Sequence, residues 1–316
     1  MIDIIKELGN ASKIGISGHI SPDGDCIGSC LGMHMYLRKR LPEAEIFVYL
    51  ETPSWVFKDV PGFTNIRQSF KKDAEFDAFI AIDTSPERMG EASKYYAEAG
   101  LKINIDHHIT NSGKEGDINY VVPGASSASE LVYNLIPGEY LDKSIAEALY
   151  MGIAHDTGVF RYSNVAPSTL NAAAVLIGYG FDFSKLLDVT FFEKTIEQNM
   201  AQGKIVLESR RYKGGRIIVG SADEAFMREN KVKKADFEGV VNQLLLTKGV
   251  VCAIFIYAKA PGVLKCSLRS KSDKVDVSKV SALFGGGGHV RAAGCDYSGS
   301  VEEAENALVE NVSRMI

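Results

Sequence analysis

Two short segments of the sequence concentrate side chains that bind divalent metals. In the first, His19 is followed by Asp23 and Asp25, so one imidazole and two carboxylates share a single loop. Such a set suits cations that accept both nitrogen and hard oxygen ligands. We interpret this loop as half of a two-metal site. The alternative is a surface loop in which an aspartate caps the helix that follows.

The second segment is Asp106-His107-His108. Two adjacent imidazoles point in different directions, so one can ligate a metal while the other faces a substrate. The preceding carboxylate can then orient one of them. Consecutive histidines after an apolar segment seldom have a packing role. This segment therefore favours the two-metal interpretation of the first loop.

Two isolated aspartates complete the candidate set. Asp83 directly follows the apolar segment 76–82 and could bridge two metals, or it could cap the next helix. Asp156 ends an apolar helical segment. A carboxylate at the C-terminal end of a helix interacts unfavourably with the helix dipole, and a nearby cation would offset this. His155, beside it, fits better as a packing residue or as a partner of a metal ligand.

Each candidate follows a segment that should form a buried element. Strands that alternate with helices indicate a mainly parallel α/β sheet, in which ligands gather at the carboxyl ends of the strands. Ser127 and Glu130 fit a capping box at the start of a further helix. The apolar patterns predict strands at 14–17, 45–50, 76–82 and 103–105, and helices at 2–8, 26–41, 91–99, 143–154 and 168–180.

Length and charge indicate two domains, since 316 residues are many for one compact core. Residues 1–207 carry 18 Lys+Arg and 27 Asp+Glu, whereas residues 208–316 carry 17 and 13, and a basic second part would attract a phosphorylated substrate. We predict a metal-binding catalytic domain at 1–190, a linker helix at 191–208 and a substrate-binding domain at 209–316. In the last, we expect strands near 216–221, 250–259 and 263–269, and helices near 235–246, 277–283 and 301–315.

The second part also contains four consecutive glycines before His289. A backbone without side chains can approach a phosphate closely, although glycine runs also occur in flexible linkers. Arg269, at the end of a predicted strand, is the best candidate for a partner cation. Arg88 could contact a phosphate or pair with Glu87 or Glu91. The candidate substrate-binding residues are Arg88, Arg269, Ser270, Gly285, Gly286, Gly287, Gly288 and His289.

Composition excludes several classes of protein. The longest apolar stretch, residues 249–257, is too short to span a bilayer. A net charge of −5 argues against a protein that binds long duplex DNA through its phosphate backbone. The five cysteines form no CxxC pair and no signal-peptide pattern opens the chain, so we expect a cytoplasmic protein. Cys26 and Cys30, one helical turn apart, are expected to pack in the core.

Taken in order, these motifs resemble those of the DHH phosphoesterase superfamily. The His19…Asp23-Gly-Asp25 loop, Asp83, Asp106-His107-His108 and Asp156 in Asp-Thr-Gly match its four catalytic motifs, and residues 285–289 match its DHHA1-type substrate domain. The resemblance covers nearly the whole chain and is greatest to small two-domain oligoribonuclease/pAp phosphatases. It implies an N-terminal, mainly parallel-sheet DHH domain and a smaller C-terminal α/β DHHA1 domain, with the active site in the cleft between them.

The resemblance also implies roles for individual residues. Two Mn²⁺ ions would be bound, with Mg²⁺ as the alternative. His108 would face the scissile phosphate, Asp106 would support the histidine pair, and Arg269 with the glycine loop would bind the rest of the nucleotide. His155 departs from the family pattern, which has a non-ionisable residue there. The implied ligands are His19, Asp23 and Asp83 for one ion, and Asp25, Asp83, His107 and Asp156 for the other, so that Asp83 bridges them.

The implied activity is hydrolysis of short oligoribonucleotides to mononucleotides, of pAp to AMP, or of both, by water activated between two metals. Short single-stranded RNA or small nucleotides would be the partners, and a homodimer is an open alternative. Two other functions stay open: a phosphodiesterase for cyclic or linear dinucleotides such as cyclic di-AMP and pApA, and a catalytically inactive nucleotide-binding module. Inorganic pyrophosphatases of the superfamily end in a different, Lys/Arg-rich motif, and its single-strand exonucleases usually carry additional domains.

Overall fold

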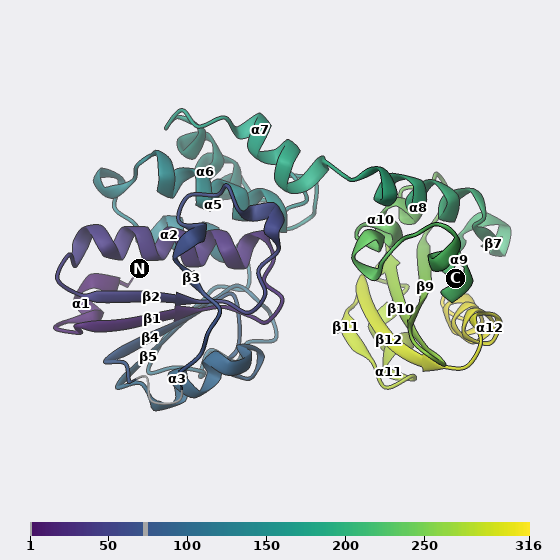
Figure 1. Cartoon of the computed structure of the whole chain (residues 1–316), viewed down its shortest axis with the longest axis horizontal. Helices are drawn as coiled ribbons and strands as arrows, with labels where there is room; N and C mark the ends of the chain where they lie inside the picture. The colour runs from purple at the N-terminus through teal and green to yellow at the C-terminus, as the bar shows by residue number, and fades with distance from the viewer. Residues whose placement is uncertain (1, 72–74) are drawn as a thin grey trace. The chain divides into compact units, whose positions relative to one another are not determined.

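The computed structural model describes residues 2–71 and 75–316. The chain divides into two compact units, Met1–Glu193 and Lys194–Ile316, which Figure 1 shows and which are described separately here. Both units are α/β, as the sequence predicts. Within the described ranges, the helices are too short or too polar to cross a bilayer.

The first unit is built on a parallel sheet of six strands in the order β3-β2-β1-β4-β5-β6. From β1 the chain moves outward to β3 in one direction, and from β4 it moves to β6 in the other. Residues just beyond β1 and β4 therefore lie at the topological switch point, where ligands bind in sheets of this kind. The strands are β1 (Lys13–Ser17), β2 (Glu45–Tyr49), β3 (Ile66–Arg67), β4 (Ala78–Ile82), β5 (Leu101–Asp106) and β6 (Ile118–Val121).

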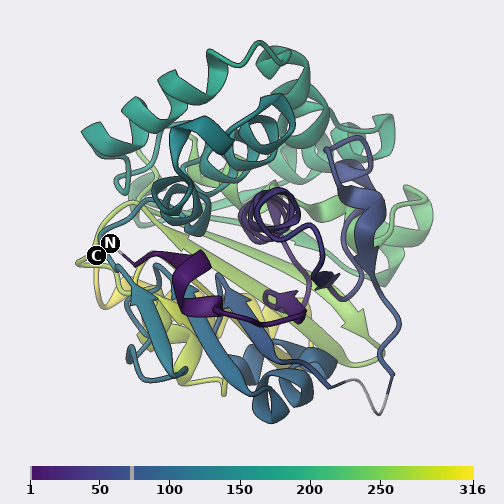
Figure 2. The same ribbon diagram turned by 90° about the vertical axis from the view of Figure 1, so that its left-hand side faces the viewer.

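Helices cover both faces of this sheet, as Figures 1 and 2 show from two sides. Aliphatic residues such as Ile16 and Ile80 form the core toward α2 and α5, whereas an aromatic cluster that includes Phe79 and Tyr95 fills the face toward α3. The helices are α1 (Ile4–Leu8), α2 (Gly24–Arg40), α3 (Ser93–Glu98), α4 (Ala128–Leu135), α5 (Lys143–Asp156), α6 (Pro167–Ile177) and α7 (Phe183–Leu187), followed by a π-helix, Asp188–Phe192.

The second unit has a mixed six-stranded sheet in the order β11-β12-β10-β9-β8-β7, in which β8 and β9 pair in parallel and the other neighbours are antiparallel. Apolar clusters on its two faces pack against α11 and α12 on one side and α8 and α10 on the other. The strands are β7 (Arg210–Tyr212), β8 (Ile217–Ala222), β9 (Cys252–Ala260), β10 (Val263–Ser270), β11 (Gly287–His289) and β12 (Ala292–Ser298). The helices are α8 (Ile196–Leu207), α9 (Glu224–Glu229), α10 (Val240–Leu245), α11 (Val277–Ala282) and α12 (Val301–Ser313).

Two predicted helices differ in the structure. Residues 191–208 do not form one linker helix: the π-helix ends at Phe192, and α8 starts anew because the Thr195 side chain accepts a hydrogen bond from the Gln198 N–H. Helix α8 then contributes Ala201 and Ile205 to the core of the second unit. The helix predicted at 235–246 is interrupted at Gly239, whose φ of +76° does not continue a helix.

Candidate metal centre

The first loop directs His19 toward two carboxylates. The His19 Nδ1 lies 2.8 Å from the Ile20 carbonyl oxygen, which accepts a hydrogen bond from it and leaves Nε2 facing Asp23 Oδ1 at 3.8 Å and Asp83 Oδ2 at 3.6 Å. Asp23 Oδ1 also accepts from the N–H groups of Asp25 and Cys26, at 3.0 and 3.1 Å. Asp23 therefore caps α2, as the alternative interpretation holds, and faces the imidazole with the same oxygen.

Asp83 lies at the centre of the arrangement. It follows β4, is 3% exposed, and has φ +60°, a left-handed conformation that aspartate tolerates better than most residues. Its Oδ1 lies 3.4 Å from His107 Nε2 and 3.6 Å from His108 Nδ1. The alternative that Asp83 caps the next helix is wrong, because Ser85 occupies the N-cap position there.

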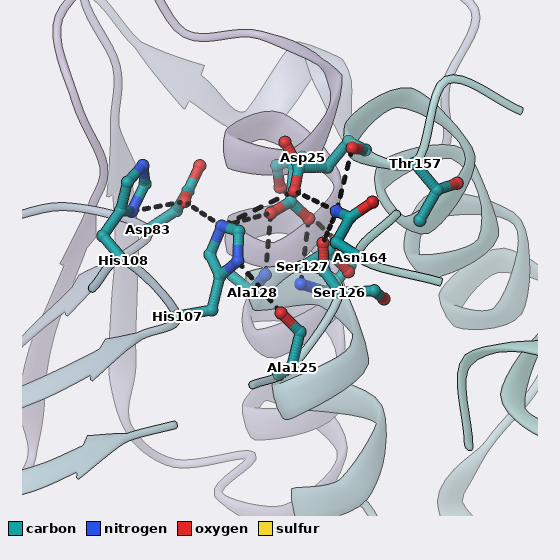
Figure 3. Close-up of polar contacts among 12 residues, drawn as sticks. Asp25, Asp83, His107, His108, Ala125, Ser126, Ser127, Ala128, Thr157 and Asn164 are labelled. Carbon is teal, nitrogen blue, oxygen red and sulfur yellow. Dashed lines mark hydrogen bonds and ion pairs between the residues drawn. The ribbon is translucent and has the colours of Figure 1, made fainter. Parts of the chain in front are cut away.

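His107 presents one ring nitrogen to three carboxylates. Its Nδ1 donates to the Ala125 carbonyl at 3.3 Å, and this contact fixes which nitrogen faces the cluster. The Nε2 atom then faces Asp83 Oδ1 at 3.4 Å, Asp156 Oδ2 at 3.7 Å and Asp25 Oδ2 at 3.9 Å. Figure 3 shows Asp25 and Asp83 on either side of this ring.

Asp25 and Asp156 are each held by neighbours. Asp25 is 1% exposed, and its two oxygens accept from the N–H groups of Ala128, at 2.7 Å, and Ser129, at 2.9 Å, in the first turn of α4. Each of these oxygens keeps a second lone pair for another partner. Asp156 ends α5, and the Asn164 amide donates to its backbone oxygen at 3.2 Å and to its Oδ2 at 3.4 Å.

The spacing of these groups suits bound cations. Their imidazole-to-carboxylate distances, 3.4–3.9 Å, exceed ordinary hydrogen-bond lengths. Two ligands about 2.1 Å from one ion lie about 3.0–3.4 Å apart in octahedral or tetrahedral coordination, so a small adjustment would place ions between them. In addition, Asp83 Oδ1 is buried without a hydrogen-bond partner in the described part of the chain, which is typical of a missing ligand.

The pKa shifts of these groups also favour bound cations. Burial lowers the pKa of both His19 and His107, but the adjacent carboxylates outweigh it and raise the pKa of His19 to about 12 and that of His107 to about 10. Burial and the other carboxylates raise the pKa of Asp156 to about 6 and that of Asp25 well above its usual value. The metal-free cluster therefore retains protons to balance its negative charge, and a divalent cation would replace them.

A second network orients His108. Asp106 Oδ1 accepts from His108 Nδ1 at 2.7 Å and from the backbone N–H groups of His107 and His108. Burial raises the pKa of Asp106, but hydrogen bonds from His108 and Asn111 outweigh it and lower the pKa below its usual value. The Asn111 amide donates to Asp106 Oδ2 at 2.7 Å and to Asn104 Oδ1 at 2.8 Å.

Three supporting asparagines were missed at the sequence level. Asn104 is fully buried within β5 and donates to the Thr84 carbonyl at 2.9 Å, which ties β5 to the chain beyond Asp83. A polar residue between Ile103 and Ile105 is a signal that could have identified it. Asn111 and Asn164 lie in loops and carry no comparable local signal.

His155 and Glu130 have packing and structural roles. The His155 ring lies between Phe57 and Phe191, with centroid distances of 5.3 and 5.2 Å, and burial lowers its pKa to about 4. It packs behind the first loop, because a Cβ on Gly24 would come within 2.3 Å of it. The predicted capping box is only half present: Ser127 accepts from the Glu130 N–H at 3.0 Å, but the Glu130 carboxylate accepts from the N–H of Ser126 instead of Ser127.

Arg88 lies close to the first loop. It ends a 3₁₀ turn, Pro86–Arg88, and its carbonyl accepts from the Ile20 N–H at 2.8 Å. The side chain is exposed. Glu91 is one of the two carboxylates that were predicted to pair with Arg88. It forms a salt bridge with Lys94 at 3.2 Å.

In the second unit, strand register aligns two of the predicted residues. Arg269 on β10 is opposite Ala292 on β12, which is opposite His289 on β11. Directly opposed residues share a face of an antiparallel sheet, so the Arg269 and His289 side chains point to the same side. Ser270 is 4% exposed, and its hydroxyl donates to the Ser272 carbonyl at 2.8 Å.

Close packing explains two alternate positions of the glycine run. A Cβ on Gly286 would lie 2.2 Å from the Gly294 carbonyl oxygen, and one on Gly288, where φ is +141°, would lie 2.5 Å from the Ala292 carbonyl oxygen. These two glycines therefore permit the close pairing of β11 with β12. Gly285 and Gly287 have open space where a Cβ would be, but the φ of +70° at Gly285 favours glycine, so Gly287 alone of the four has no structural explanation.

Comparisons with known proteins agree with this fold. Residues 13–153 match the N-terminal domain of the DHH family, and residues 214–316 match the DHHA1 domain. The two matches define a two-domain protein of the DHH type. The resemblance seen in the motifs is thereby confirmed: the chain belongs to the DHH/DHHA1 phosphoesterase family.

Similar proteins match over nearly the whole chain. The bifunctional oligoribonuclease and PAP phosphatase NrnA of Thermus thermophilus is 29% identical over 304 residues, which span 95% of this chain and 89% of that protein. The probable bifunctional oligoribonuclease and PAP phosphatase NrnA of Streptococcus mutans is 30% identical, with 97% and 96% covered. The crystal structure of an exopolyphosphatase-related protein from Bacteroides fragilis has a TM-score of 0.90 at 29% identity, with 99% and 96% covered.

Proposed function

We propose that the protein is a metal-dependent phosphoesterase that hydrolyses short oligoribonucleotides to mononucleotides, pAp to AMP, or both. The observation that carries this proposal is the position of Asp83, whose two oxygens face His19 Nε2 at 3.6 Å and His107 Nε2 at 3.4 Å. One carboxylate between two imidazoles, with further aspartates around each, is suited to a pair of cations. The names of the similar NrnA proteins support the substrate class.

The proposed cofactor is a pair of Mn²⁺ ions, with Mg²⁺ as the alternative. Bound in this way, two cations lower the pKa of a water molecule and neutralise charge on phosphate oxygens. The chain's contribution is to fix the ligand atoms through contacts such as that of Ala125 with His107. The proposed ligands are His19, Asp23 and Asp83 for one ion, and Asp25, Asp83, His107 and Asp156 for the other.

His108 is the proposed proton donor. Asp106 engages its Nδ1 at 2.7 Å, so a hydrogen bond or proton passed to the phosphate or the leaving oxygen would come from Nε2. The same carboxylate also accepts from two backbone N–H groups, which limits how far it can move. Asp106 is thus a positioning residue, and its effect reaches the substrate through His108.

Substrate contacts outside the metal cluster remain part of the proposal. Arg88 is exposed beside the first loop and is suited to a phosphate of the substrate. Arg269 and His289 share one face of the second sheet, whereas the N–H groups of Gly285 and Gly286 already donate to the carbonyls of Ala282 and Ser281. Ser270 is buried, and we assign it to holding the end of β10 through its bond with Ser272.

A turnover panel with the Mn²⁺-loaded full-length protein tests the function. The substrates are pAp, pApA, RNA of two to five nucleotides, cyclic di-AMP and pyrophosphate. We expect release of mononucleotides from short RNA, of AMP and phosphate from pAp, or of both. Protein treated with a chelator should lose these activities, and added Mn²⁺ should restore them.

The other outcomes decide between the alternatives. Faster turnover of cyclic di-AMP or pApA than of short RNA and pAp would favour a dinucleotide phosphodiesterase. Binding of these nucleotides without turnover of any would favour a nucleotide-binding module. An Asp59→Asn variant is a matched control for changes at the metal cluster, because Asp59 is an exposed aspartate of the same unit and lies outside the cluster.

A further inference from the structure

A buried thiol lies close to the proposed binding position of the first ion, whose ligands are His19, Asp23 and Asp83. This position is called the first metal position below, and that of the other ion the second. Cys26 is in the first turn of α2, next to Asp25, and is 0% exposed. An added Cβ on Gly18 would stand 2.2 Å from the Cys26 sulfur and 3.0 Å from the Ile82 carbonyl oxygen. The sulfur therefore fills the space between the ends of β1 and β4, the two strands that deliver His19 and Asp83.

The Cys26 thiol lies close to both His19 and Asp83. Ligand atoms of His19, Cys26 and Asp83 all lie within 4.8 Å of one another. The backbone N–H of Cys26 also donates to Asp23 Oδ1 at 3.1 Å, the oxygen that faces His19. Cys30, one turn further along α2 and equally buried, belongs to none of the three clusters of potential metal ligands formed by the described residues.

The donor atoms at the two metal positions are therefore different. The second position offers the His107 nitrogen and carboxylate oxygens from Asp25, Asp83 and Asp156. The first offers the His19 nitrogen, oxygens of Asp23 and Asp83, and a nearby sulfur. A thiolate is a soft ligand that favours Zn²⁺ and other thiophilic cations over Mn²⁺ and Mg²⁺.

We propose that the Cys26 thiolate is an additional ligand of the first metal position and gives that position a preference for thiophilic cations such as Zn²⁺, Co²⁺ and Cd²⁺. Coordination forms a sulfur–metal bond, and the thiol proton is released to solvent. The inference rests on the metal centre of the proposed function, but it concerns which ion is bound and not which substrate is cleaved. The competing explanation is that Cys26 only packs against its neighbours.

Absorption spectra of the Co²⁺-loaded full-length protein distinguish the two explanations. We expect a sulfur-to-cobalt charge-transfer band in the near ultraviolet that saturates at one Co²⁺ per chain. A Cys26→Ser variant should lose this band while still binding Co²⁺ through histidine and aspartate. The matched control Cys30→Ser should keep the band. Absence of the band in the unmodified protein, or its persistence in Cys26→Ser, would overturn the proposal.

A second measurement needs no variant and covers the case in which Cys26→Ser fails to fold. X-ray absorption of protein loaded with one equivalent of Zn²⁺ should show one sulfur at about 2.3 Å. Cys266 and Cys295 lie opposite each other on β10 and β12, so zinc bound there would show two sulfurs instead. Nitrogen and oxygen ligands alone, or two sulfurs, would contradict the assignment to Cys26.

The measurements of sulfur coordination and the turnover panel can fail independently of each other. A protein that hydrolyses short RNA with Mn²⁺ but shows no sulfur coordination would retain the proposed function and lose this inference. A protein with sulfur coordination that hydrolyses none of the substrates would do the reverse. If both hold, Cys26→Ser should also lower the affinity for Zn²⁺ by at least roughly 10-fold relative to that for Mn²⁺.

Discussion

The carboxyl edge of the first sheet and the glycine segment of the second are both sites that the sequence marks for anion or metal chemistry, yet they are built differently. At the first, Asp25 and Asp83 are almost fully buried and imidazoles point at them. At the second, residues 287–289 are exposed, and Gly286 and Gly288 serve the pairing of β11 with β12. Buried carboxylates are costly unless they are neutralised, and here they outnumber the imidazoles that face them, so the cluster favours a bound cation. Glycines also meet ordinary structural needs, so a run of them implies less.

The largest expected effect is that of Asp83→Asn. Asparagine tolerates the left-handed backbone at this position, so the fold should survive. It removes the charge that two cations would share, so we expect turnover with Mn²⁺ to fall by more than about 100-fold, beyond the range typical of residues that only orient a ligand. Initial rates and circular dichroism, with Asp59→Asn as the control, check this. Near-normal activity would refute the bridging role.

Asp106→Asn should have a smaller effect. The variant keeps the shape of the side chain but weakens its hold on His108 Nδ1, so we expect a loss of about 10- to 100-fold in kcat with little change in KM. A change confined to stability, with kcat and KM both unaltered, would show that Asp106 is structural only.

A pair of alanine substitutions separates packing from binding in the glycine segment. Gly288→Ala places a Cβ 2.5 Å from the Ala292 carbonyl oxygen and should destabilise the second unit by about 1–3 kcal/mol, measured by denaturant unfolding. Gly287→Ala meets open space and should leave stability unchanged. If the loop binds nucleotide, Gly287→Ala should still raise KM. Equal stability of the two variants would contradict the assigned packing role of Gly288.

The last prediction concerns metal binding instead of turnover or stability, and it is a dependence on pH. In the metal-free protein the carboxylates raise the pKa of His19 to about 12 and that of His107 to about 10, so both rings carry a proton at pH 7. A cation needs neutral imidazoles, so binding must expel protons and affinity must rise with pH, by about tenfold per pH unit for each proton released. Calorimetry in buffers of different ionisation enthalpy measures this release. Mn²⁺ affinity that is constant between pH 6 and 8 would contradict it.

The fold was predictable where apolar patterns were long. The strands expected at 14–17, 45–50, 76–82 and 103–105 correspond to β1, β2, β4 and β5. Short strands such as β3 and β11 have two or three residues, too few for a hydrophobic period. The break between the π-helix and α8 depends on the cap at Thr195, a local hydrogen bond that outweighs helical periodicity.

The clustering of the candidate metal ligands was predictable for a different reason. Ionisable residues placed just after parallel strands must emerge at one edge of the sheet, so His19, Asp83 and His107 meet whatever the loops between them do. Contacts made through a backbone carbonyl, such as that of Ala125 with His107, have no sequence signature. The same holds for Asn164, which reaches Asp156 from a loop.

The double engagement of Asp25 has a further consequence. This carboxylate accepts from the amides of Ala128 and Ser129 and also faces His107, so it joins the start of α2 to the start of α4. Any event that changes the charge of Asp25, including the binding or release of an ion, changes the strength of its hydrogen bonds with those two amides. Their rates of hydrogen–deuterium exchange would therefore report occupancy of the centre from within the polypeptide backbone, without a substrate.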